Sequence, residues 1–162
     1  MDRTGLLYVG RVDGGLFASV VGLGTMHNAY QLQERVQTEG PGVRRLWLDL
    51  RQCPGIDSTF MGVLAGFLRE GVEVQVFGVG PRAQEQMEAV GLDRLVQFVS
   101  DPPETGLPPL EPHPAQGLPP ASTVPFIEQA HRSLASSSPE ADRLYSPFLK
   151  RLEDERKRSG QG

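Results

Sequence analysis

Residues 46–68 read LWLDLRQCPGIDSTFMGVLAGFL, and within this stretch a strand pattern gives way to a helical pattern. Leucines at every second position of 46–50 predict a strand, whereas residues 60–68 carry apolar side chains at helical spacing. Between them lie residues 57–59, an aspartate, a serine and a threonine, which are residue types preferred at helix N-caps. A buried strand that leads directly into a helix is the repeating unit of an α/β fold.

The same alternation of strand and helix patterns continues on both sides of this stretch. Strands are predicted over residues 6–9, 16–21, 43–50, 72–76 and 95–99, and helices over residues 28–39, 60–68 and 82–90. The turn sequence at 13–15 predicts that the first two strands form a hairpin. The later strands are separated by single helices, so we expect right-handed crossovers and an α/β fold with a mostly parallel sheet.

The composition changes sharply after residue 100. Eight of the fourteen prolines lie in residues 102–120, which predicts a semi-stiff, largely unstructured spacer. Helical patterning returns at Ser122 and Thr123, and Ser138-Pro139-Glu140 begins a second helical segment, in which Pro147 predicts a kink or a restart.

We therefore expect three parts, which are an α/β domain over residues 1–100, a proline-rich linker over 101–121 and a two-helix extension over 122–158. Two short amphipathic helices are not stable alone, so the extension must dock on the core or on a partner.

Composition argues against several classes of function. The formal charge of -4 gives no support for a nucleic-acid binder, which usually has a basic face. The only cysteine, Cys53, cannot form an internal disulfide, which fits a reducing compartment. No apolar stretch approaches the ~18–20 residues of a membrane span, and the N-terminus lacks the pattern of a signal peptide. We expect a cytoplasmic protein without membrane insertion.

Catalytic signatures are scarce in the sequence. His27, His113 and His131 stand in unrelated contexts, and neither a metal-ligand spacing nor a nucleophile elbow is present. We expect no enzymatic activity, no metal site and no cofactor. Gly62 and Gly66 lie on one face of the predicted helix, where a strand or another helix could approach closely.

The junction at residues 57–59 permits two interpretations. As N-cap residues, these side chains would stabilise the helix by about 1 kcal/mol. Alternatively, a hydroxyl in the first turn could carry a phosphate, which would meet free backbone N–H groups and the positive end of the helix dipole. Such a phosphate would add roughly -1.5 to -2 charges without unfolding the domain. The residues alone leave both interpretations open.

Several motifs, taken in order, resemble the STAS domain of bacterial anti-sigma factor antagonists. They are the apolar strand ending in Asp49-Leu50, Ile56-Asp57-Ser58-Thr59 before an apolar helix, Val79-Gly80-Pro81 before another, and Gly91-Leu92-Asp93-Arg94-Leu95. The likeness covers most of residues 5–100.

The resemblance implies an α/β fold in which a mixed sheet has helices mainly on one face. It also implies an antagonist that is not itself an enzyme and that binds an anti-sigma factor when unphosphorylated. That partner would be a serine kinase of the histidine-kinase-like ATPase type, and a phosphatase would restore the complex. Ser58 would be the phosphoacceptor, with Thr59 as the alternative. Partner-binding residues would be Asp57, Ser58, Thr59, Phe60 and Met61.

One residue departs from the family pattern, because Phe60 stands where a glycine often follows. The phenylalanine could obstruct a kinase or turn inward to the core. The alternative function is a non-switching STAS docking subunit of a membrane complex, such as a lipid-transport ABC system. A third hypothesis is that the domain itself binds a nucleotide or a lipid through its glycine turns.

Overall fold

A computed structural model describes residues 4–114 and 117–160 of the chain. Its strands are β1 (Leu6–Val12), β2 (Gly15–Val21), β3 (Arg45–Asp49), β4 (Glu73–Phe77), β5 (Gln97–Val99) and β6 (Glu111–Pro112). Its α-helices are α1 (Met26–Glu39), α2 (Ser58–Arg69), α3 (Pro81–Ala89), α4 (Thr123–Ala135) and α5 (Pro139–Ser159). Two short 3₁₀ helices, η1 (Leu92–Arg94) and η2 (Pro120–Ser122), complete the described elements.

The strands form one mixed sheet in the order β5-β4-β3-β2-β1-β6. Strands β2 to β5 pair in parallel, whereas β1 pairs with β2 as an antiparallel hairpin. The parallel register aligns the buried residues Leu16, Leu46 and Val74 in one row across the sheet. The predicted α/β fold, mostly parallel with a hairpin toward one edge, is confirmed.

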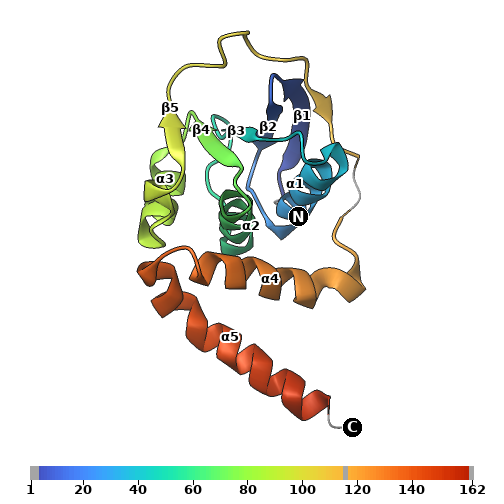
Figure 1. Cartoon of the computed structure of the whole chain (residues 1–162), viewed down its shortest axis with the longest axis vertical. Helices are drawn as coiled ribbons and strands as arrows, with labels where there is room; N and C mark the ends of the chain where they lie inside the picture. The colour runs from blue at the N-terminus through green and yellow to red at the C-terminus, as the bar shows by residue number, and fades with distance from the viewer. Residues whose placement is uncertain (1–3, 115–116, 161–162) are drawn as a thin grey trace.

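Helices α1, α2 and α3 lie together on one face of the sheet, as the resemblance predicted (Figure 1). Their buried residues join those of the strands in a single apolar core. Helix α2 differs from its neighbours because every residue from Thr59 to Ala65 is buried. A helix that is apolar all round needs cover on every side, and the sheet lies on only one of them.

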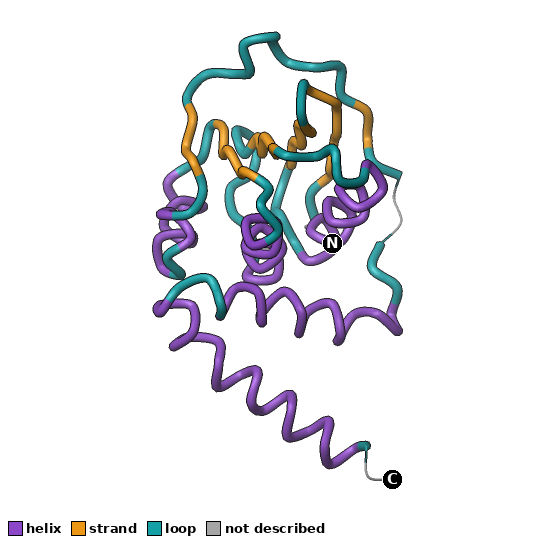
Figure 2. Tube along the Cα trace, in the orientation of Figure 1, coloured by secondary structure: helices purple, strands orange, loops and turns teal. Residues whose placement is uncertain are grey.

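Helix α4 supplies further cover for α2. It forms a separate layer that passes α1 and α2 on the side away from the sheet, and α5 packs against its outer side (Figure 2). The two-helix extension therefore docks on the core of its own chain. Sequence reasoning had left open whether it would dock there or on a partner.

The proline-rich segment is irregular, as predicted, but it is not a detached spacer. Pro103 is buried, and Pro102 and Pro103 share a cleft with Trp47 on the opposite side of the sheet from the helices. Farther along, β6 pairs with β1 and extends the sheet by a sixth strand that the sequence did not predict. Residues 115 and 116 of the predicted linker lie outside the described residues.

Helix α5 passes through Pro147 as one continuous element, so the predicted restart there is wrong. Proline lacks a backbone N–H, so its place in a helix interior leaves one carbonyl of the preceding turn without its usual donor. Pro147 is exposed, so water can satisfy that carbonyl. Ser138 caps the start of this helix by accepting a hydrogen bond from the N–H of Ala141.

Cys53 should be unreactive toward thiol reagents in the folded protein. It is 4% exposed, and burial raises the pKa of its thiol above the ordinary value, so little thiolate is present at pH 8. We expect Ellman's reagent to leave the native protein unlabelled and to label one thiol per chain after unfolding in guanidinium. Stoichiometric labelling of the native protein within the mixing time would contradict the buried position.

Candidate functional site

The loop before α2 is fixed on two sides. Gly24, just after β2, donates to the carbonyl of Gly55 and accepts from the N–H of Asp57. On the other side the side chain of Gln86, from α3, accepts from the N–H of Ile56. The start of α2 is therefore held by the segment after β2 and by α3, and its first residues have a defined orientation.

Asp57 is the N-cap of α2. Its backbone is extended, with φ -89° and ψ 173°, and its Oδ1 accepts a 2.8 Å hydrogen bond from the N–H of Phe60. Because Asp57 performs the capping, the hydroxyl of Ser58 at the first helical position is free for another role. The helix begins two residues earlier than the predicted range of 60–68, and the cap explains the difference.

The hydroxyl of Ser58 faces a histidine from the extension. Ser58 Oγ lies 2.9 Å from His131 Nε2, although the two residues are 73 positions apart. His131 Nδ1 lies 2.8 Å from the carbonyl oxygen of Ile127, which can only accept. In the neutral ring Nδ1 therefore carries the proton, and Nε2 accepts the hydrogen bond that the Ser58 hydroxyl donates.

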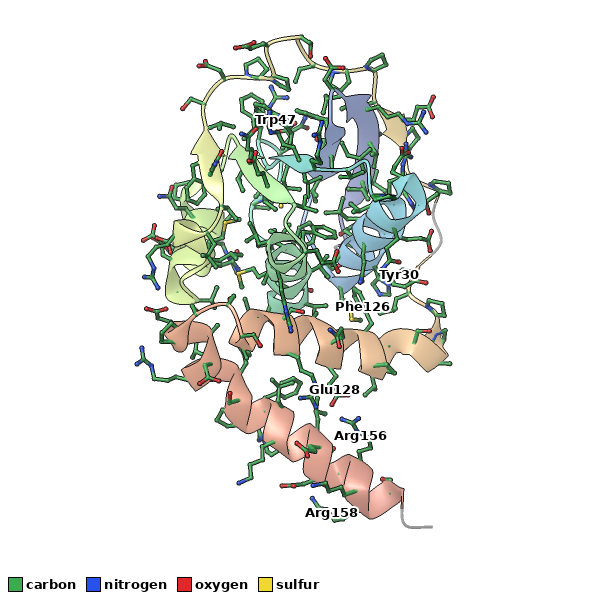
Figure 3. The ribbon with its side chains drawn as sticks, viewed as in Figure 1. Tyr30, Trp47, Phe126, Glu128, Arg156 and Arg158 are labelled. Atoms are coloured by element: carbon green, nitrogen blue, oxygen red, sulfur yellow. The ribbon has the colours of Figure 1, made fainter. Side chains whose placement is uncertain are left out.

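Helix α5 holds the His131 ring from its other side. Tyr145 and Phe148 both pack edge-on against it, with ring centroids 5.1 Å away in each case. Next to this cluster Glu128 of α4 forms ion pairs with Arg132 and with Arg156 of α5 (Figure 3). The position of His131 over Ser58 thus depends on both helices of the extension.

Helices α2 and α4 approach most closely at the two glycines that the sequence singled out. A Cβ atom on Gly62 would overlap the backbone carbonyl of Ala130, and one on Gly66 would lie 3.9 Å from Cβ of Ser133. The absence of side chains at Gly62 and Gly66 permits this crossing. The predicted close approach is confirmed, and the approaching element is a helix.

The five residues predicted to bind a partner differ widely in exposure. Asp57 is exposed and Ser58 is half-buried, whereas Thr59, Phe60 and Met61 are buried. Phe60 is 0% exposed and lies beside Gly24, so its ring fills the core and does not project over the loop. The sequence allowed Phe60 either to obstruct a kinase or to turn inward to the core, and in the structure it turns inward.

Desolvation and hydrogen bonding act in opposite directions on the pKa of the Asp57 carboxyl. Desolvation raises the pKa of its carboxyl above the ordinary value, while hydrogen bonds from backbone N–H groups, led by that of Phe60, and the nearby His131 act in the opposite direction. A further negative charge beside Asp57 would repel its carboxylate and raise the pKa of that carboxyl further.

Within residues 4–114 and 117–160, no group of three or more His, Cys, Asp or Glu side chains comes together as a metal site would require. No helix in the described ranges is both long and apolar enough to cross a membrane.

Sequence reasoning found Asp57, Ser58 and the glycine face, but it missed His131. No local pattern connects that histidine to residue 58, because the contact depends on where α4 docks. The helical spacing of apolar residues in the extension indicated that one face of its helices must be covered, but it did not indicate that His131 would meet Ser58.

Two solved structures that share this architecture are anti-sigma factor antagonists. SpoIIAA in its unphosphorylated form matches over 61% of this chain and 92% of its own, at 13% identity and a TM-score of 0.51. An antagonist from Mycobacterium paratuberculosis matches over 62% of this chain and 90% of its own, at 20% identity and a TM-score of 0.52. No family model and no curated protein matches the sequence.

At these identities the likeness concerns the fold. Neither structure is described as a subunit of a membrane transport system, so the comparisons do not favour the alternative of a docking subunit. Each covers about three fifths of this chain, so a substantial part of the chain lies outside the shared architecture. The chain has the STAS fold of the anti-sigma factor antagonists, as the resemblance in its sequence predicted.

Proposed function

We propose that this chain is an anti-sigma factor antagonist whose binding is controlled by phosphorylation of Ser58. The observation that supports this most is the position of Ser58 in a chain with the antagonist fold. It is the first residue of α2 and directly follows the capping Asp57. It thus stands where a helix N-terminus favours an added phosphate.

The geometry supports Ser58 over Thr59 as the phosphoacceptor. Thr59 is 5% exposed and belongs to the buried part of α2, whereas Ser58 is half-buried at the end of the helix. A phosphate on Ser58 would lie at the end of the helix on the side of His131, while one on Thr59 would have to be accommodated inside the core. Burial of a doubly charged group without partners is costly, so modification at Thr59 would disturb the fold.

The proposed cycle assigns this chain a regulatory role. The unphosphorylated form binds an anti-sigma factor of the histidine-kinase-like ATPase type and thereby releases a sigma factor for transcription. The kinase then transfers the γ-phosphoryl group of its ATP to Ser58 Oγ, so that ADP leaves and the serine proton passes to a base of the kinase. The phosphate ends the complex by charge repulsion, and a phosphatase restores the hydroxyl by hydrolysis.

Binding to the candidate kinases tests this function. We expect one anti-sigma kinase of the organism, purified with ADP bound, to form a one-to-one complex with the unphosphorylated chain in isothermal titration calorimetry. ATPase subunits of lipid-transport ABC systems from the same organism serve as the control and should give no heat. Binding to such an ATPase, together with no binding to any kinase active on its own antagonist, would contradict the proposal.

A further inference from the structure

We propose that α4 and α5 form a displaceable lid, defined as residues 123–159, that competes with the partner for the face of α2. This inference rests on the proposed function, because it assigns a regulator to the same site. The partner and the lid would use the same surface, so only one of them could occupy it at a time.

The first argument is the surface that the lid covers. The lid crosses α2 at Gly62 and Gly66, just beyond Ser58, the residue at which the proposed function places control of partner binding. That crossing brings Ala130 and Ser133 against a helix face without side chains, which is a surface suited to another helix. A partner docked on the start of α2 would collide with α4 in its present position.

The second argument is the hydroxyl of Ser58. It donates its hydrogen bond to His131, whose ring is buried between α2 and the aromatic residues of α5. A phosphoryl group needs an open line of approach to the serine oxygen, and His131 occupies the space beside that oxygen. Phosphorylation of Ser58 therefore requires that His131, and α4 with it, move away.

The third argument is how few side chains the lid contributes to the apolar core. Among the described residues, the fully buried members of the apolar core that come from the lid are Ala130, Leu134 and Ala141. The remaining core residues belong to the sheet, to α1–α3 and to the segments that connect them. When the lid leaves, the sheet and α1–α3 therefore keep their packing against one another, and the face of α2 that α4 covers becomes accessible to a partner.

The lid also carries contacts at its edges, besides the partly buried Phe126 and Tyr145 that pack against the core. Tyr30 and Phe126 meet edge-on with ring centroids 5.4 Å apart (Figure 3). Arg94 pairs with Glu140 at 2.7 Å near the surface. Exposed ion pairs contribute little to stability, so this attachment is suited to opening. A partner can bind only to molecules whose lid is open, so its apparent affinity is the intrinsic affinity multiplied by the open fraction.

A disulfide between α2 and α4 tests the lid directly. The Cβ–Cβ separation of 3.9 Å between positions 66 and 133 lies within the range for a disulfide, so Gly66→Cys with Ser133→Cys can lock the lid. We expect the oxidised protein to lose phosphorylation of Ser58 by the anti-sigma kinase and ATP at least about tenfold relative to the same protein after reduction. Cys53 is buried and does not compete, and Gly66→Cys alone controls for the loss of glycine.

A substitution that favours the open lid tests the opposite effect. Leu134→Asp places a charge in a fully buried position of the lid, whereas Val124→Asp adds the same charge at a side chain of α4 that is 62% exposed. We expect Leu134→Asp to raise the apparent affinity and phosphorylation rate by about tenfold or more, and Val124→Asp to leave both unchanged. Hydrogen exchange should show α4 and α5 opening while β3 and β4 stay protected.

The outcomes separate the two proposals. Equal phosphorylation of the locked and reduced proteins, or exchange in α4 as slow as in β3, would overturn the lid and leave the antagonist function standing. If Leu134→Asp keeps its sheet protected yet no active kinase binds or phosphorylates it, the antagonist function fails, and the regulatory role of the lid fails with it.

Discussion

Replacement of Phe60 by alanine should lower the free energy of unfolding by about 3–5 kcal/mol. The ring is fully buried in the core between the sheet and α2, beside Gly24 and the start of the helix. Its removal would leave a cavity whose walls are fixed by the clamped loop at residues 55–57, so the site cannot collapse easily. A loss of this size is a large part of the stability of an ordinary domain.

Chemical denaturation monitored by circular dichroism and by the fluorescence of Trp47 measures this effect. Phe98→Ala is the matched control, because that ring on β5 is 37% exposed and its truncation should cost below about 1 kcal/mol. If Phe60→Ala were no more costly than Phe98→Ala, the ring would have to lie outside the core. Phe60 would then be a surface obstacle to a kinase, which is the other outcome considered from the sequence.

Replacement of Ser58 by aspartate should weaken binding to the anti-sigma kinase by at least about 100-fold, which corresponds to about 2.8 kcal/mol. The new carboxylate would stand at the start of α2 beside Asp57, whose carboxyl accepts the capping hydrogen bond from the N–H of Phe60. Two adjacent negative charges would repel an acidic partner surface as a phosphate does. Ser58→Ala removes only the hydrogen bond to His131 and should bind at least as tightly as the unsubstituted chain.

Isothermal titration with the ADP-bound kinase compares these variants. Ser100→Asp adds the same charge at an exposed position after β5 and should not change the affinity. Unaltered binding by Ser58→Asp would show that the surface at residue 58 is not a charge-controlled contact. Equal losses in Ser58→Asp and Ser100→Asp would assign the effect to net charge and not to the site.

Much of the α/β domain follows from local patterns in the sequence. Alternation at residues 46–50 and helical spacing at 60–68 are set by neighbouring residues, so they predict the elements without knowledge of distant contacts. The same holds for the hairpin turn at Gly14, which adopts a positive φ of 77° that glycine accommodates without strain. The role of Asp57 is also predicted locally, because aspartate just before a helical pattern is a preferred N-cap residue.

The remaining features depend on contacts between distant parts of the chain. Strand β6 forms in a segment whose prolines disfavour regular pairing, because the free edge of β1 offers hydrogen bonds to a neighbour. The contact between Ser58 and His131 arises only when α4 crosses α2 at Gly62. Amphipathic spacing in α4 shows that one face must be covered, but it does not identify the surface that covers it.

The most direct test of the central claim is to locate the phosphate after incubation with an anti-sigma kinase and ATP. Trypsin cuts after Arg51 and Arg69, and the peptide between them contains Ser58 and Thr59 as its only hydroxyl side chains. Tandem mass spectrometry should place the phosphate on Ser58 in the unsubstituted chain and in Thr59→Val, and find none in this peptide of Ser58→Ala. An unmodified peptide, with a kinase active on another antagonist, would contradict the account, as would a phosphate on Thr59 alone.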